Sequence, residues 1–199
     1  MPCNGKVMFT GSIGLENEDA VFKALGTKIG NRAKRYPDGE TGIRAKWIRW
    51  VFDLFEQHPQ LILASGNRDS GSPQEQQAFP RFVMAEGVTS ETLHFDTLGY
   101  AQEALLSFTK FKSFKKDGII PKDVRFQVSL PTAAALVTNF IDMDYRSQIE
   151  PAIEQGLGRD VAAICAAIPA YELAFQWDVA HEVIAHDGGE VMHYDDILA

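Results

Sequence analysis

Short apolar runs separated by helix-length segments are the feature that most limits the folds open to this chain. Five runs read as strands: residues 7–10, 34–37, 92–95, 124–130 and 171–177. Parallel strands need long crossover connections, usually helices, so this order predicts a parallel sheet with helices outside it. Two architectures fit the pattern, an open doubly wound sheet and a (β/α) barrel.

Several of the intervening segments carry clear helix signals. Asn17 precedes the acidic residues Glu18 and Asp19, which is typical of a capped helix start. Apolar residues recur at helical spacing over 43–57, and His58 and Pro59 should end that helix. We also expect helices over 99–115 and 150–168, and one that begins at Pro131 and Thr132. Residues 65–78 are rich in turn formers and predict a long loop, and residues 79–84 could begin an added hairpin.

The densest group of chemically useful side chains follows the second run. Asp38 and Glu40 flank Gly39, and Arg44 lies in the first turn of the next helix. The glycine allows a sharp turn, so both acids can point into the same small volume. Such a pair suits a ligand that carries an ammonium group or one that needs a proton moved. The plainer alternative is an ordinary turn with acids near a helix N-terminus.

Polar residues also follow the other runs. Ser12 comes after the first run, Ser129 lies near the end of the fourth, and Gln176 and Asp178 close the fifth. In either architecture the residues just after the strands face the ligand. Asp178 and its neighbour Glu182 could equally be solvated acids on a loop. The chain has no GxGxxG or GxxxxGK[ST] pattern, so we expect no nucleotide cofactor.

Composition narrows the possible partners and compartment. The chain has 199 residues, of which 45% are hydrophobic and 23% charged, so we expect a single domain over residues 1–199. The formal net charge of −8 argues against nucleic acid as a partner. No apolar run approaches the ~20 residues that span a membrane, so we expect no membrane partner. Cys3 and Cys165 form no CxxC pair, which fits a reduced cytoplasmic setting.

Four short motifs together resemble a known family. The motifs are Gly11-Ser12, Asp38-Gly39-Glu40 with Arg44, Gln127-Val128-Ser129-Leu130-Pro131 and Gln176-Trp177-Asp178. At these motifs the chain resembles the cobalamin-independent methionine synthase-like barrels. Those barrels belong to the superfamily that also holds uroporphyrinogen decarboxylase. The resemblance implies a TIM barrel. A complete TIM barrel needs ~250 residues and eight βα units, whereas about five are counted here. We therefore expect a TIM-barrel-like α/β fold, truncated after about strand five.

The resemblance also implies roles for individual residues. Ser12 would meet the carboxylate of an amino acid, and Glu40 and Asp178 would hold its ammonium group. The expected function is a methionine synthase-like enzyme acting on a small amino-acid-like or carboxylated substrate, with methyl transfer as one reaction. The candidate catalytic residues are Asp38, Glu40 and Asp178. The candidate substrate-binding residues are Ser12, Arg44, Ser129, Gln176 and Glu182.

Two departures from the family leave alternatives open. The synthases bind zinc through a His-x-Cys motif, a glutamate and a second cysteine after the fifth strand, but Cys165 precedes that strand here. His181, His186 and His193 match no metal signature, so we expect no metal and no cofactor. A non-catalytic ligand-binding or assembly protein, an inactive truncated barrel and a metal-free lyase or decarboxylase remain as alternatives. A five-stranded remnant would leave strand edges uncovered, so we expect a homo-oligomer in which another copy covers them.

Overall fold

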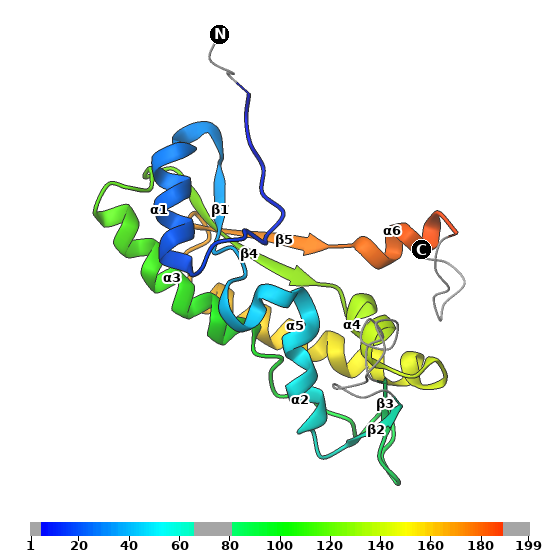
Figure 1. Cartoon of the computed structure of the whole chain (residues 1–199). Helices are drawn as coiled ribbons and strands as arrows, with labels where there is room; N and C mark the ends of the chain where they lie inside the picture. The colour runs from blue at the N-terminus through cyan, green and yellow to red at the C-terminus, as the bar shows by residue number, and fades with distance from the viewer. Residues whose placement is uncertain (1–4, 66–80, 189–199) are drawn as a thin grey trace. The chain divides into compact units, whose positions relative to one another are not determined.

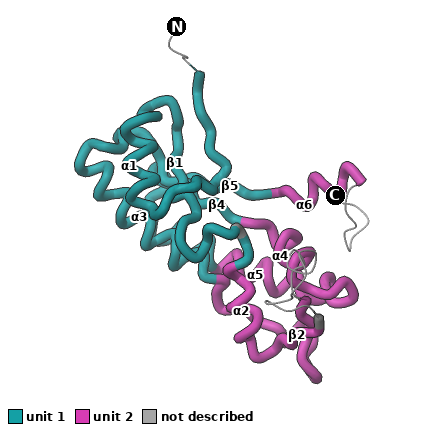
Figure 2. The backbone as a smooth tube through the Cα atoms, viewed as in Figure 1, with its two compact units in different colours: residues 1–49, 99–130, 160–178 teal, residues 50–98, 131–159, 179–199 magenta. Residues whose placement is uncertain are grey.

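The computed structural model describes residues 5–65 and 81–188, and the chain divides into two compact units (Figures 1 and 2). The first unit contains residues 1–49, 99–130 and 160–178, and the second contains residues 50–98, 131–159 and 179–199. Each unit is assembled from three separate stretches of chain. Neither unit therefore corresponds to a continuous half of the sequence.

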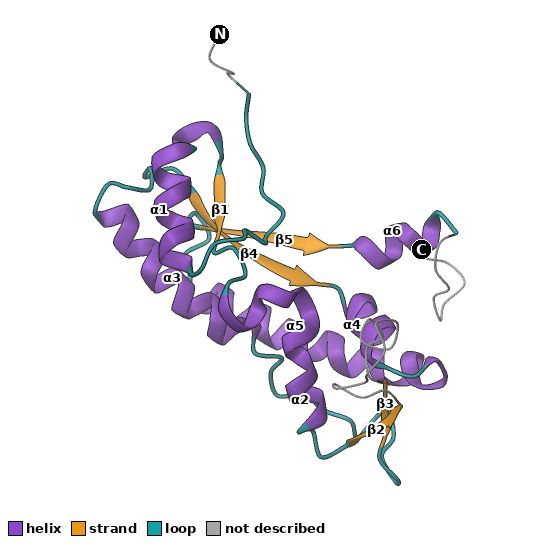
Figure 3. Ribbon diagram, viewed as in Figure 1, coloured by secondary structure: helices purple, strands orange, loops and turns teal. Residues whose placement is uncertain are grey.

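The first unit is built on a three-stranded parallel sheet. Its strands are β1 (Arg35–Pro37), β4 (Arg125–Pro131) and β5 (Leu173–Asp178), in the order β1-β4-β5 (Figure 3). Tyr36 lies opposite Phe126 in the parallel pairing of β1 with β4. These are the runs predicted over 34–37, 124–130 and 171–177, so three of the five expected strands are confirmed.

The expectation of a TIM-barrel-like fold is wrong. Residues 7–10 and 92–95 form no strand, and β2 (Leu61–Ser65) pairs antiparallel with β3 (Arg81–Met84) in a sheet of their own. A barrel requires one continuous sheet that closes on itself, whereas the strands described here are divided between two sheets. Residues 81–84 do lie in a hairpin, but they form its second strand and not its beginning, because the hairpin starts at β2, where no strand was predicted. The loop predicted over 65–78 falls almost entirely outside the described residues.

Two helices of the first unit begin at well-defined caps. In α1 (Glu18–Lys28), the Asn17 side chain accepts a hydrogen bond of 2.9 Å from the Ala20 backbone N–H, as the sequence predicted. In α3 (Tyr100–Lys116), the Tyr100 backbone N–H donates to Asp160 Oδ2 at 3.2 Å. Asp160 is far away in the sequence, so tertiary packing supplies the acid that caps this helix.

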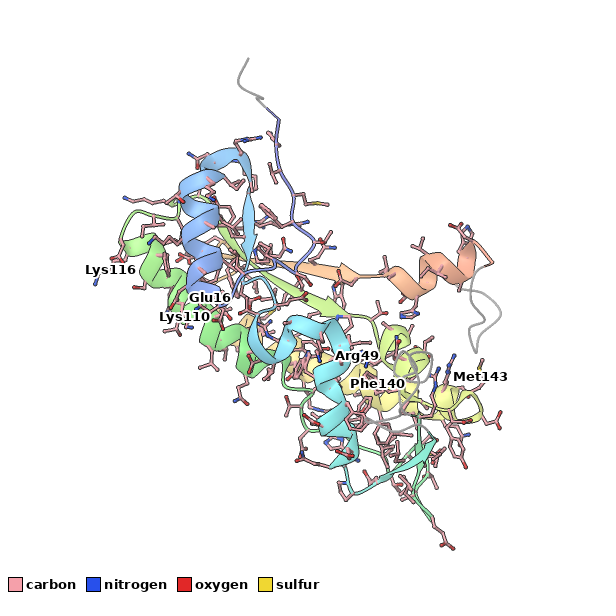
Figure 4. All side chains as sticks on the ribbon, viewed as in Figure 1. Glu16, Arg49, Lys110, Lys116, Phe140 and Met143 are labelled. Atoms are coloured by element: carbon pink, nitrogen blue, oxygen red, sulfur yellow. The ribbon has the colours of Figure 1, made fainter. Side chains whose placement is uncertain are left out.

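Helices α1 and α3 pack on one face of the central strand. Phe126 of β4 lies 5.4 Å from Phe111 and 5.7 Å from Phe108 of α3, measured between ring centroids. Phe22 of α1 meets Phe111 edge to face at 5.5 Å. Lys110, labelled in Figure 4, joins the same two helices through an ion pair with Glu18 at 3.1 Å. Because successive strand residues point to opposite faces, Gln127 and Ser129 lie on the face away from these helices.

The second unit contains the antiparallel hairpin and shorter helices. Its helices are α2 (Phe52–Glu56), α4 (Ala133–Phe140), the short 3-10 helix η4 (Met143–Tyr145) and α6 (Ala180–His186). Phe55 of α2 contacts the rings of Phe82, Phe95 and Phe140 at centroid distances of 5.5 to 5.9 Å, and Phe140 is labelled in Figure 4. This aromatic cluster ties α2, β3 and α4 into one core.

Two further elements cross the boundary between the units. The helix predicted over 43–57 forms instead as a 3-10 segment, η2 (Gly42–Val51), followed by the short α2. The helix α5 (Arg146–Ala167) starts four residues before the predicted 150 and ends near the predicted 168. A third short 3-10 helix, η1 (Gly30–Arg32), connects α1 with β1.

Candidate functional site

The turn after β1 has an unusual backbone conformation. Gly39, Glu40 and Gly42 all have positive φ, at 84°, 51° and 63°. Glycine adopts this region readily, but a side-chain-bearing residue such as Glu40 pays roughly 1–2 kcal/mol for it. Asp38 stabilises the turn, because its Oδ1 accepts a hydrogen bond of 3.0 Å from the Glu40 backbone N–H. Strain at a single acidic residue is a feature of functional sites.

A buried ion pair holds the other side of this turn. Arg44 Nη2 donates to Asp38 Oδ2 at 2.6 Å, and the two residues are 8% and 5% exposed. Arg44 Nε also lies 3.6 Å from Glu103 Oε2, which is an ion-pair distance but too long for a hydrogen bond. Both oxygens of Asp38 are therefore occupied, and both Asp38 and Arg44 act inside the protein to orient the turn.

Ser12 and Glu40 are brought into direct contact. The Ser12 hydroxyl donates a short hydrogen bond to Glu40 Oε2, and Ser12 itself is exposed. The adjoining Gly11 has no room for a side chain, because a Cβ there would lie 2.8 Å from Ser129 Oγ and 3.2 Å from Glu40 Cδ. Ser12, Ser129 and the Glu40 carboxylate thus gather around Gly11.

Electrostatics also link Glu40 with Asp178 at the end of β5. Burial raises the pKa of the Glu40 carboxyl above its usual value, and the hydrogen bond from Ser12 acts in the opposite direction. The negative charges of Asp178 and Asp38 raise this pKa further, whereas Arg44 lowers it. Asp38 and Asp178, the other two acids predicted as catalytic residues, therefore both act on the pKa of Glu40.

The remaining predicted residues are placed differently. Ser129 Oγ donates to the Thr10 backbone carbonyl at 3.1 Å, next to Gly11. Gln176 Oε1 accepts from Arg35 Nη2 at 3.0 Å, and its Nε2 donates to the Trp177 carbonyl at 3.1 Å, so its amide is used within the sheet. Glu182 lies on α6 in the second unit, whereas the residues that gather around Gly11 belong to the first unit.

Three residues near the acids were not anticipated from the sequence. Tyr100 and Glu103 lie in the first turn of α3, and Gln127 lies in the middle of β4. Burial raises the pKa of the Tyr100 phenol well above 10, and Glu40, Asp160 and Asp178 add to this effect while Arg44 opposes it. The available signals for Gln127 were its place in the resembling motif and its position on the polar face of the alternating run 124–130, together with Arg125 and Ser129. No local pattern marks Tyr100 or Glu103.

A separate pocket of about 720 Å³ lies in the second unit, beside His58, His94 and Asp96. His58 Nδ1 accepts from the Gln60 backbone N–H at 3.3 Å, so its Nε2 carries the proton and donates to the His94 carbonyl at 2.9 Å. His94 Nε2 lies 3.1 Å from Asp96 Oδ1. Because these imidazole nitrogens already have partners within the protein, we regard the pocket as a weaker candidate than the acidic site.

Within residues 5–65 and 81–188, no group of three or more His, Cys, Asp or Glu side chains is arranged to hold a metal ion. None of the helices described here has both the length and the apolar character needed to cross a membrane. No family model, curated protein or solved structure matches this chain.

Proposed function

We propose that the site in the first unit binds a small amino-acid-like ligand through its protonated amine, with Glu40 and Asp178 as the acceptors. The observation that carries this proposal is the position of Glu40. Its partly buried carboxylate receives a hydrogen bond from the exposed Ser12 hydroxyl and lies within the electrostatic influence of Asp178.

The charge balance of the site favours a cation. Asp38 and Arg44 neutralise each other in their buried pair, and Glu40 and Asp178 add two further carboxylates to the site. An ammonium group carries three N–H donors and a positive charge, so it can compensate both carboxylates at once. A ligand of this kind would also relieve the repulsion that raises the pKa of Glu40.

Ser12 suits the opposite end of the same ligand. Its hydroxyl is exposed and can rotate from Glu40 toward a ligand carboxylate once an ammonium group has taken its place. This arrangement agrees with the roles that the methionine synthase resemblance implies for Ser12, Glu40 and Asp178. The ligand would thus be held as a zwitterion between one hydroxyl and two carboxylates.

An enzymatic role would use Glu40 as the proton carrier. A carboxyl with a raised pKa gives and accepts protons closer to neutral pH than an ordinary glutamate does. Methyl transfer to or from the bound ligand is the reaction that the family resemblance suggests. Metal-free lyase or decarboxylase chemistry at the same carboxylates is the second candidate, and both begin with the same bound amine.

Calorimetric titration with matched ligands tests the proposal. We expect an α-amino acid to bind, and the α-hydroxy acid with the same side chain to bind at least about tenfold more weakly, because it lacks the ammonium group. Glu40→Gln and Asp178→Asn should abolish this binding without lowering the thermal unfolding midpoint. Glu86→Gln, at an exposed position in the second unit, is the matched control and should bind normally.

Two results would reject this function. Equal binding of the amino acid and the hydroxy acid would show that the amine is not recognised. A large loss of thermal stability in both Glu40→Gln and Asp178→Asn would show that these acids support the fold instead. Product analysis of the bound ligand by mass spectrometry then separates an enzyme from a binding protein, since only an enzyme consumes its ligand.

A further inference from the structure

The segment that carries Ser12 is attached to the sheet by side chains and not by a strand ladder. We call residues 7–13 the strap. Its ends are held by backbone hydrogen bonds, from Val7 N–H to the Arg32 carbonyl at 2.9 Å and from Ile13 N–H to the Gly39 carbonyl at 2.9 Å. Between these ends the strap crosses the polar face of β4 without forming a strand.

Two side chains of β4 hold the middle of the strap. Gln127 Nε2 donates to the Phe9 carbonyl at 3.0 Å and lies 3.3 Å from the Thr10 carbonyl. Ser129 Oγ donates to the same Thr10 carbonyl at 3.1 Å. Backbone carbonyls outside a ladder need donors, and these two side chains provide them.

Gln127 is an unusual residue for the middle of a central strand. It is 1% exposed, and it lies beside the apolar residues Phe126 and Val128. Its Oε1 is buried and has no hydrogen-bond partner among the described residues, so the amide is oriented by its Nε2 contacts alone. A buried amide is costly unless its polar atoms are paired, so the bonds from Nε2 to the strap offset part of the cost of burying Gln127.

We propose that Gln127 and Ser129 are positioning residues that fix the strap across β4 and thereby hold Ser12 against Glu40. Ser12 follows Thr10 by two residues, and the intervening Gly11 permits the close approach of the strap to Ser129 and Glu40. This proposal adds positioning residues to the site described under the proposed function. Its consequence for ligand binding depends on that function. Its structural part concerns the protein alone and can be measured without ligand.

The titration of Glu40, followed by carbon-13 NMR of its side-chain carboxyl, tests this positioning. The Ser12 hydrogen bond lowers the pKa of Glu40, so Ser12→Ala should raise that pKa. Gln127→Met removes the donor while keeping side-chain length and adding no charge. We expect it to raise the pKa of Glu40 by a similar amount, because Asp38, Asp178, Arg44 and Tyr100 stay in place around the carboxyl.

The double variant and a control complete this test. Ser12→Ala combined with Gln127→Met should raise the pKa of Glu40 no further than either change alone, since both remove the same hydrogen bond. Gln102→Met, the same substitution at an exposed position of α3, should leave the titration unchanged. Independent, additive effects of the two single changes would overturn the proposal, as would an unchanged titration in Gln127→Met.

Amide hydrogen exchange keeps the proposal testable if Gln127→Met folds poorly. Ser129→Ala removes one donor to the strap, and we expect it to accelerate exchange at the Ile13 amide on the order of tenfold. Unchanged exchange at Ile13 in this variant would overturn the proposal. If the amino acid does not bind but the NMR titration gives the expected result, the ligand function is rejected and the positioning role stands.

Discussion

Asp38 and Arg44 form a buried ion pair, with 2.6 Å between Oδ2 and Nη2, that shapes the turn carrying Glu40. The second oxygen of Asp38 accepts the Glu40 backbone N–H, so one carboxylate links the start of η2 to the strained residue before it. Asp38, which the sequence predicted as a catalytic residue, thus supports the turn that holds Glu40 against Ser12.

Breaking this ion pair should be strongly destabilising. Removing one partner leaves the other charge buried without compensation, which costs about 3–5 kcal/mol. We therefore expect Asp38→Asn and Arg44→Met each to lower the free energy of unfolding by this amount in urea denaturation. The double variant should lose much less than the sum of the two, and additive losses would show that the pair does not act as a unit.

Gly39 should tolerate no side chain. Its φ is 84°, and a Cβ at this position would lie 2.7 Å from Val21 Cγ2 of α1. Gly39→Ala should therefore cost about 1–3 kcal/mol of unfolding free energy, because the backbone conformation and the packing both oppose it. Gly14→Ala is the control, since a Cβ there meets nothing within 4 Å. Equal stability of the two variants would contradict the described turn geometry.

At Glu40, the residue after Gly39, the positive φ predicts that glycine is more stable than alanine. Glycine adopts this conformation without strain, whereas alanine has the same difficulty as glutamate. Glu40→Gly should consequently be more stable than Glu40→Ala by about 1 kcal/mol, the reverse of the order found at ordinary positions. Thermal unfolding of the two variants measures this difference, and an Ala variant at least as stable as the Gly variant would argue against the strain.

Local signals in the sequence predicted the starts of α1 and α4 and the strand β4 well. Asn17 caps α1 as expected because its side chain and its acceptor are three residues apart. The alternation in β4 was also sufficient, since strand residues alternate between faces regardless of their partners. The turn at Asp38, Gly39 and Glu40 was recognised for the same reason, because its conformation is set by adjacent residues.

The errors arose where the outcome depends on partners far away in the sequence. Residues 7–10 have the apolar character of a strand, but the Phe9 and Thr10 carbonyls accept hydrogen bonds from the side chains of Gln127 and Ser129. The barrel expectation counted such runs as strands, although strand formation depends on tertiary context. Tyr100 and Asp160 meet across sixty residues, which no motif could indicate.

The sheet of the first unit leads to a prediction about assembly. In the order β1-β4-β5, each outer strand has one neighbour among the described residues, and Trp177 on β5 is 42% exposed. Uncovered strand edges favour pairing with another chain, so we expect a homo-oligomer in light scattering across a concentration series. Trp177→Lys should shift the mass toward the monomer. A monomeric mass for the unmodified protein at all concentrations would contradict this expectation.

The raised pKa of Glu40 predicts how stability depends on pH. Between the ordinary glutamate pKa and the raised one, the folded protein binds more protons than the unfolded chain does. The stability that Glu40 contributes is therefore present below the ordinary pKa and is lost as the pH rises through the folded value. The glutamine side chain in Glu40→Gln cannot ionise, so this variant should not lose stability as the pH rises. We expect its unfolding free energy to equal that of the unmodified protein in acid and to exceed it at neutral pH. Urea unfolding at a series of pH values measures this difference, and a constant offset between the two proteins would show that ionisation of Glu40 is not coupled to folding.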